Sequence, residues 1–159
     1  MSTIKKRVRC HPESVRGNLA EQPEDVREHM YQALSDAALG VKSETAKPFG
    51  EDRRLAKVMK IIKDARDGNR YRGAYTIEFP EAIWVLDVFA KKSTQGIKTP
   101  KVDIDRLVER LKSLRRYRQD PEGKRIVAAL LVELAAKAEA AKEDERKMYA
   151  PRHRKPKGT

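Results

Sequence analysis

Two adjacent lysines, Lys91 and Lys92, directly follow an apolar run over residues 82–90. We expect this run to be a central strand, because it is apolar almost throughout. A buried strand that brings two ammonium groups to the end of a sheet provides a fixed place for phosphate. In the preceding segment, residues 70–79, polar and apolar side chains alternate, so Arg72 and Thr76 share one face. The chemistry that suits this arrangement is the binding of phosphate groups.

These cations also have a purely structural interpretation. An arginine on the polar face of a strand is more often solvated or ion-paired than catalytic. A lysine pair at the end of a strand usually protects the edge of a sheet from association. On the residues alone, both interpretations stay open.

Metal and disulfide chemistry is not expected. Cys10 is the single cysteine, and together with His11 and His29 it lies near no other plausible metal ligand. We therefore expect no metal and no small-molecule cofactor. A lone cysteine is typical of the reducing cytosol, and no apolar run is long enough to span a bilayer. The expected location is cytoplasmic, with no membrane partner.

The charge of the chain points to a polyanionic partner. The 159 residues include 36 Lys and Arg against 24 Asp and Glu, which gives a formal net charge of +12. Such an excess favours nucleic acid first and an anionic membrane surface second. Hydrophobic residues make up 39% of the chain, so we expect a modest core.

The elements that position these residues are predicted from hydrophobic periodicity. Residues 55–65, 70–79 and 82–90 read as three strands, and Asp67-Gly68-Asn69 is a strong hairpin signal between the first two. We predict an α+β fold with a small antiparallel sheet of three or four strands. Residues 4–10 are a candidate edge strand, and residues 41–52 read as a loop.

Helices are predicted on both sides of the strand region. One begins at Pro23 and ends at Gly40, which suits the residue after a helix C-terminus. A second has Thr99 as N-cap and Pro100 as its first residue, and a third runs from the Asp120-Pro121-Glu122 signal to about Met148. Arg118, near the end of the second helix, is expected to be solvated. The segment 150–159 is basic and expected to be disordered.

The ordered motifs resemble a known family. Residues 71–75 read YR-x-x-Y, residues 85–93 read V-L-x-x-F-x-K-K-S, and residues 96–100 read G-I-K-T-P before an amphipathic helix. This order resembles the RelE/HigB-like toxins of type II toxin–antitoxin systems, and within them the phage-derived HigB-like branch. The resemblance implies a RelE/ParE-like fold with N-terminal helices and a C-terminal helical extension. It divides the chain into a polar segment 1–21, a toxin domain 22–118, a helix 119–149 and the tail 150–159.

The resemblance also implies an activity. Toxins of this kind cleave messenger RNA, many of them in the ribosomal A site, with the 2′-hydroxyl of the RNA as nucleophile and without a metal. Arg72 then matches an arginine that clamps phosphate, and Lys92, flanked by Lys91, matches a basic residue against the scissile phosphate. Lys60 is a candidate proton acceptor if its neighbours depress its pKa.

This sequence departs from the pattern at two positions. Asp87 stands where the branch commonly has histidine, and Lys60 stands where it commonly has glutamate. Asp87 is therefore a candidate catalytic residue that pairs with Arg72 or Lys60, or a sign that the acid–base machinery is degraded. Contacts to the RNA backbone are expected from the remaining cations around the strands, namely Lys57, Lys63, Arg66, Arg70, Lys98 and Lys101.

The expected partners are messenger RNA, the ribosome and a helix-turn-helix antitoxin encoded nearby. Three other functions stay open. The fold also suits a nucleic-acid-binding protein that no longer cleaves, or a gyrase-directed toxin of the ParE type, because fold alone does not determine function. The third is a basic RNA-binding protein unrelated to toxins.

Overall fold

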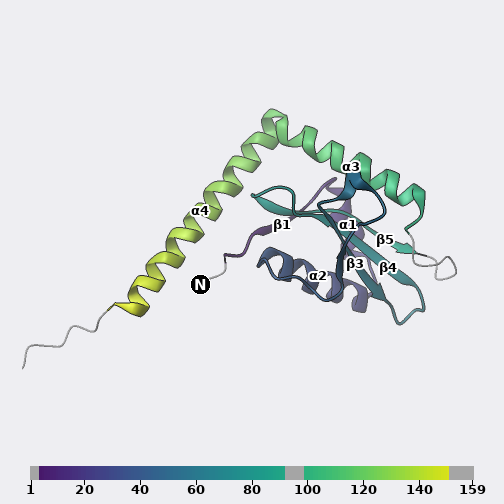
Figure 1. Cartoon of the computed structure of the whole chain (residues 1–159), viewed down its shortest axis with the longest axis horizontal. Coiled ribbons are helices and arrows are strands. Elements are labelled where there is room, and N and C mark those ends of the chain that lie inside the picture. Colours follow the sequence, from purple (N-terminus) through teal and green to yellow (C-terminus); the bar gives the residue numbers. More distant parts are fainter. Residues whose placement is uncertain (1–3, 92–98, 151–159) are drawn as a thin grey trace, which may run out of the picture.

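A five-stranded sheet in the order β1-β5-β4-β3-β2 forms the centre of the structure, a computed structural model that describes residues 4–91 and 99–150 (Figure 1). The strands β3, β4 and β5 form an antiparallel meander, as predicted. The strands are β1 (Arg7–Cys10), β2 (Ala46–Pro48), β3 (Val58–Asp64), β4 (Arg70–Thr76) and β5 (Ala82–Lys91).

Both edges of the sheet depart from the predicted antiparallel meander. The strand β1 lies at the edge of the sheet, as predicted, but it pairs with β5 in parallel, so the sheet is mixed and not wholly antiparallel. The strand β2 lies within the segment expected to be a loop and pairs antiparallel with β3. A strand of three residues is too short to show a period, so its sequence gave no strand signal.

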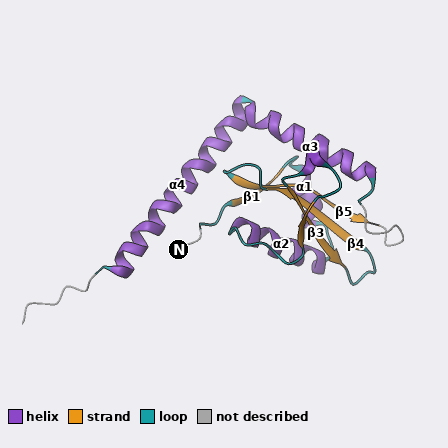
Figure 2. Ribbon diagram, in the orientation of Figure 1, coloured by secondary structure: helices purple, strands orange, loops and turns teal. Residues whose placement is uncertain are grey.

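Helices cover both faces of the sheet (Figure 2). The helices α1 (Ser14–Ala20) and α2 (Glu24–Ala38) pack on one face, and α3 (Lys101–Gln119) packs on the other. A short 3₁₀ helix, η1 (Arg53–Leu55), lies between β2 and β3. The α+β class and the C-terminal helical extension are confirmed.

The helix α2 shows how the sequence determines the packing on the face of the sheet that α1 and α2 cover. Pro23 precedes its first residue, and Gly40, which follows its C-terminus, has a φ of 75° as the predicted helix end requires. Its apolar stripe includes Met30, which is fully buried against β4. A Cβ atom added to Gly73 would lie 2.8 Å from the Met30 Sδ, so glycine permits this close approach of helix and strand.

The second face is a separate core between the sheet and α3. Trp84 and Leu86 of β5 pack there with Leu107, Leu111 and Leu114 of α3, all of them buried. Burial of large aliphatic and aromatic side chains stabilises by roughly 1.5–3 kcal/mol each. This packing places α3 directly over the candidate site.

The helix α4 (Pro121–Tyr149) extends away from the sheet, as Figure 1 shows. It contacts α3 through Leu130 and reaches β1 through an ion pair of 2.9 Å between Arg7 Nε and Glu133 Oε1. Beyond residue 141 every described residue of this helix is exposed. None of the helices in the described ranges has the length and hydropathy needed to cross a membrane.

The C-terminal end of α3 is tied to the turn between β4 and β5 by a buried carboxylate. Glu81 has no exposed surface and accepts hydrogen bonds from Trp84 Nε1 at 2.8 Å and from Arg118 Nε at 3.0 Å. Arg118 also lies 3.9 Å from the centre of the Phe79 ring. The expectation that Arg118 is solvated is therefore wrong. Its partner Glu81 lies far away in the sequence, and helical periodicity cannot predict such a contact.

We expect Arg118→Ala to lower the free energy of unfolding by about 3–5 kcal/mol, because it leaves the Glu81 carboxylate buried without its cation. Arg115→Ala is the matched control, since Arg115 is 48% exposed and its ion pair with Glu78 is worth about 0–1 kcal/mol. Urea unfolding followed by circular dichroism measures both changes. Equal losses in the two variants would contradict a special role for the buried pair.

Candidate functional site

Three predicted catalytic residues lie on the face of the sheet that α3 covers. Lys60 is opposite Ala74, and Ala74 is opposite Asp87, so Lys60 and Asp87 belong to one row across three strands. Arg72 lies two residues along β4, opposite Ile62 and Phe89. The structure thus brings Lys60, Arg72 and Asp87 onto one surface.

A β-bulge determines the direction of Asp87. Ala74 pairs with Asp87 while its neighbour Tyr75 pairs with Val85, so Leu86 is the extra residue in β5. Such a bulge resets the alternation of a strand. Leu86 and Asp87 consequently both belong to the α3 side, although a strict period of two would separate them.

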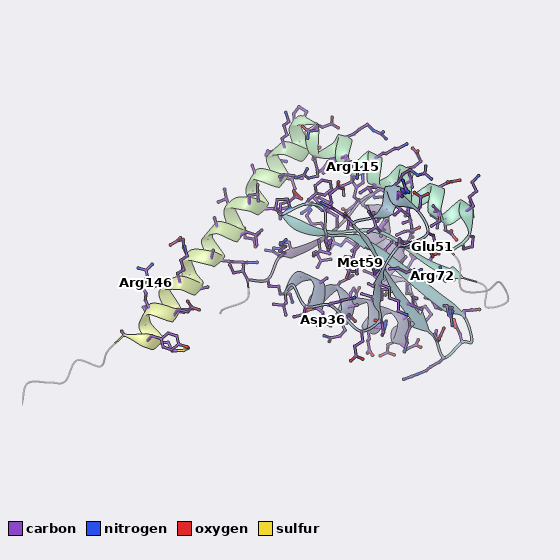
Figure 3. The ribbon with its side chains drawn as sticks, in the orientation of Figure 1. Asp36, Glu51, Met59, Arg72, Arg115 and Arg146 are labelled. Carbon is purple, nitrogen blue, oxygen red and sulfur yellow. The ribbon has the colours of Figure 1, made fainter. Side chains whose placement is uncertain are left out.

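Arg72 is fully buried, with 0% of its surface exposed. Its guanidinium donates a hydrogen bond to the hydroxyl of Thr99, and Glu51 is a neighbouring carboxylate (Figure 3). Burial lowers the pKa of Arg72, while Glu51 and Asp103 oppose this change. An arginine stays charged in such a setting, so Arg72 is a fixed cation. The predicted polar strand face is therefore covered at Arg72, because Thr99 and α3 pack on it.

Thr99 has a different role from the predicted one. The N-cap of α3 is Pro100, and no side chain caps this helix end. The Thr99 hydroxyl instead accepts from Arg72 and donates to Glu51 Oε1 at 3.4 Å. A buried cation needs an oxygen acceptor, and the threonine supplies it.

Lys60 is paired with a carboxylate that the sequence interpretation did not single out. Its Nζ lies 3.0 Å from Glu51 Oε1 and 5.0 Å from the centre of the Phe49 ring. Burial acts to raise the pKa of Glu51, but hydrogen bonds from Lys60 and from the backbone hold it below the usual value. Glu51 is therefore ionised at neutral pH. Glu51 follows β2, so the carboxylate beside Lys60 comes from another segment of the chain.

Asp87 pairs with two arginines of α3, and not with the expected Arg72 or Lys60. Its carboxylate accepts from Arg106 Nε at 2.7 Å and lies 2.8 Å from Arg110 NH1. Arg106 also reaches Asp103 at 2.6 Å and lies 5.2 Å from the centre of the Phe89 ring. Burial opposes ionisation of Arg106, but the carboxylates of Asp87 and Asp103 raise its pKa.

Sequence reasoning missed Arg106 and Arg110, although a signal for them exists. They stand four residues apart and alternate with the buried Leu107 and Leu111, so they border the apolar face of α3. They pair with Asp87 because the bulge in β5 turns Asp87 toward α3, and no local sequence pattern predicts this bulge.

The remaining predicted cations are distributed over several surfaces. Arg70 shares the face of Arg72 and forms an ion pair of 2.7 Å with Asp64. Lys63 lies on the opposite face, near His29, and Lys57, Arg66 and Lys101 are exposed outside the strands. Lys91 ends β5 opposite Arg70. Lys92 and Lys98 lie outside the described residues.

In residues 4–91 and 99–150, no three His, Cys, Asp or Glu side chains gather in a way that would hold a metal ion. The arrangement of charges nevertheless suits acid–base chemistry. One partly exposed carboxylate, Glu51, lies beside a lysine and close to a fixed arginine. A base next to fixed cations is suited to the handling of phosphate esters.

Comparison with known protein families identifies the family of the chain. Residues 17–112 match the family described as Phage derived protein Gp49-like (DUF891), and this match spans more than half of the chain. No curated protein matches the sequence. The chain therefore belongs to the Gp49-like family of phage-derived proteins, which is associated with toxin–antitoxin systems of the RelE/HigB-like kind.

Proposed function

We propose that this protein is the toxin of a toxin–antitoxin pair and cleaves messenger RNA on the ribosome. The observation that carries the proposal is the Glu51 carboxylate, which lies 3.0 Å from Lys60 and is joined through Thr99 to the buried Arg72. Family membership supports the toxin class, and the net charge of +12 supports a nucleic-acid partner. The antitoxin would be a helix-turn-helix protein encoded nearby, as the resemblance implies.

The proposed reaction uses the RNA's own 2′-hydroxyl. Glu51 accepts the 2′ proton, the 2′ oxygen attacks the adjacent phosphorus, and the bond from phosphorus to the 5′ oxygen breaks. The products are a 2′,3′-cyclic phosphate and a 5′-hydroxyl, whose oxygen takes its proton from water, while protonated Glu51 returns its proton to water. Arg72 and Lys92 stabilise the negative charge that develops on the phosphate oxygens, with Lys91 beside them. In this scheme Glu51 replaces Lys60 as the proton acceptor, and Lys60 holds Glu51 in its ionised form.

Access to Arg72 requires a change of hydrogen-bond partner. Because Thr99 covers the guanidinium, a phosphate oxygen has to replace the Thr99 hydroxyl as its acceptor. A planar guanidinium can bind phosphate through two parallel hydrogen bonds, which are stronger than a bond to a neutral hydroxyl. This difference favours the exchange once the RNA is held by the surrounding cations.

The complete burial of Arg72 also favours a second candidate, a nucleic-acid-binding protein of the same family that does not cleave. In that case Arg72, Thr99 and Glu51 serve only to join the sheet to the start of α3. Asp87, with both oxygens engaged by Arg106 and Arg110, fits such a structural role. Cleavage by the wild-type protein distinguishes the two candidates.

We expect Arg72→Ala to lower the rate of messenger RNA cleavage by about 100- to 1,000-fold, the usual loss when one electrostatic stabiliser is removed. Arg72→Lys should fail as well, because one ammonium group cannot make the two-pronged contact. Primer extension on translating ribosomes maps the cuts, and circular dichroism verifies the fold. Arg125→Ala, an exposed change on α4, is the control. A folded Arg72→Ala protein that cuts at the wild-type rate would exclude Arg72 from the site.

Glu51→Gln tests the proton acceptor, and we expect it to lower cleavage by about 100- to 10,000-fold. The pH dependence gives a second readout. Because the pKa of Glu51 lies below its ordinary value of 4.5, the base form is present at neutral pH and is lost only as the pH falls through that lower value. The rate on ribosomes should therefore stay level between about pH 6 and 8. A rate that rises with pH across this range would instead indicate a lysine as the proton acceptor.

A further inference from the structure

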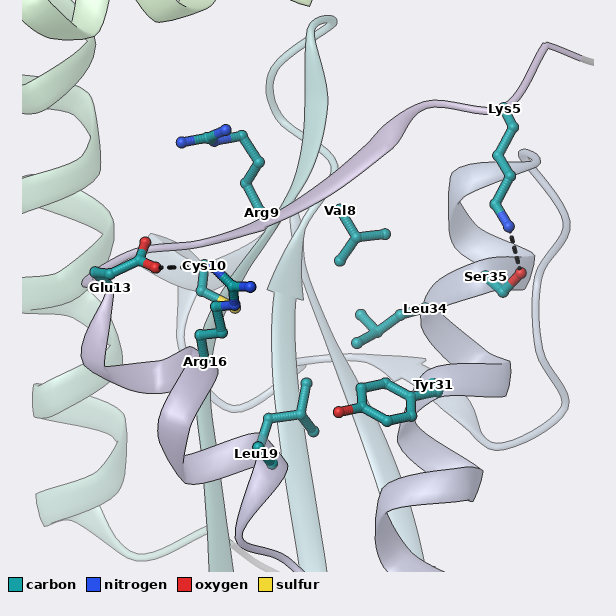
Figure 4. A pocket seen from close by; sticks show the side chains of 11 residues that line it. Lys5, Val8, Arg9, Cys10, Glu13, Arg16, Leu19, Tyr31, Leu34 and Ser35 are labelled. Atoms are coloured by element: carbon teal, nitrogen blue, oxygen red, sulfur yellow. Dashed lines mark hydrogen bonds and ion pairs between the residues drawn. The ribbon is translucent and has the colours of Figure 1, made fainter.

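A groove of about 680 Å³ lies between β1, α1 and α2, on the face of the sheet opposite to Arg72 (Figure 4). Its floor is aliphatic, with Leu19 from α1, Leu34 from α2 and Val8 from β1. The Tyr31 side chain points into it between the two leucines, and its hydroxyl lies within the groove. None of these residues takes part in the chemistry proposed for the other face.

The rim of the groove is basic. Lys5 and Arg16 line it together with a single carboxylate, Glu13. Arg16 and Glu13 form an exposed ion pair of 3.6 Å, which is easily replaced, and Lys5 donates to the Ser35 hydroxyl at 3.0 Å. Arg9 also borders the groove, but its guanidinium lies 5.7 Å from the centre of the Trp84 ring, on the other face of the sheet. The two cations of the rim, Lys5 and Arg16, still outnumber its single carboxylate.

An aliphatic floor inside a basic rim is complementary to one kind of occupant. We propose that this groove binds an acidic, amphipathic segment of a partner protein, with its leucine-like side chains on the floor and its carboxylates on the rim. Apolar anchors provide the affinity of such an interface, and the charged rim provides its specificity and rate of association. The net charge of +12 attracts an acidic partner over a distance.

Other occupants fit these features less well. The RNA backbone carries the correct charge, but it has no aliphatic groups for Val8, Leu19 and Leu34. The chain's own last nine residues, PRHRKPKGT, are basic and would be repelled by the rim. A second copy of this chain would bring another strongly positive body to the same surface.

The groove contains a cysteine thiol whose reactivity can report whether a molecule is bound there. Cys10 is the single cysteine of the chain, lines the groove and is partly buried. Burial, followed by the nearby Glu13, raises its pKa to about 11, so it reacts slowly with maleimides and a change in that rate is measurable. Protection of Cys10 therefore locates a bound molecule without any added label.

The experiment uses the full chain and two amphipathic model peptides that share their leucine positions and carry either glutamate or lysine elsewhere. We expect the glutamate peptide to bind in fluorescence anisotropy and, at saturation, to slow maleimide reaction at Cys10 by about tenfold. Lys5→Glu with Arg16→Glu should weaken this binding by at least about tenfold. The matched control, Lys124→Glu with Arg125→Glu on α4, makes the same change in net charge and should alter it by less than about threefold.

Four results would overturn the proposal: no binding of the glutamate peptide, equal binding of the lysine peptide, equal losses in both double variants, or unchanged reactivity of Cys10 at saturation. Protection of Cys10 by a single-stranded RNA in place of the peptide, or by concentration-dependent dimers of the chain, would also overturn it. If circular dichroism shows that the groove variant is unfolded, Arg16→Glu alone replaces it, because the Arg16 side chain is 81% exposed.

Discussion

Charged side chains that leave water have to be paired, and this constraint positions α3 on the sheet. Glu81 and Asp87 are buried on the face that α3 covers, and their partners Arg118, Arg106 and Arg110 all come from that one helix. Removing either member of such a pair leaves an uncompensated charge, which costs far more than an exposed ion pair contributes. The apolar packing of α3 would tolerate small shifts along the helix axis, whereas these ion pairs allow only one register.

The same constraint links the fold to the candidate site. Lys60 and Arg72 are buried on the same face of the sheet as Asp87, and their oxygen acceptors come from the segments that flank the sheet, Glu51 after β2 and Thr99 before α3. A site of this kind cannot form until the meander, β2 and α3 are all in place. The cations are held in fixed positions by the fold itself, which is the property that electrostatic stabilisation of a reaction requires.

Much of the fold follows from local patterns in the sequence, and much of the site does not. The meander and the helices from Pro23, Pro100 and Pro121 follow from periodicity and end signals, and the structure confirms them. The bulge at Leu86 is different, since almost every residue of β5 is apolar and either face could have been buried. The sequence pattern singles out Arg72, but its burial depends on Thr99 and α3, which lie far from it in the sequence.

The parallel pairing of β1 with β5 has a consequence for how the chain folds. Residues at the start of the chain have to wait for Ala82–Val85 before they gain a strand partner, so this contact has a large closure entropy and forms late. During synthesis the meander can form while β1 is still without a place in the sheet. The groove that β1 completes with α1 and α2 is then among the last surfaces to appear. A protein that recognises this groove would bind only chains that have finished folding.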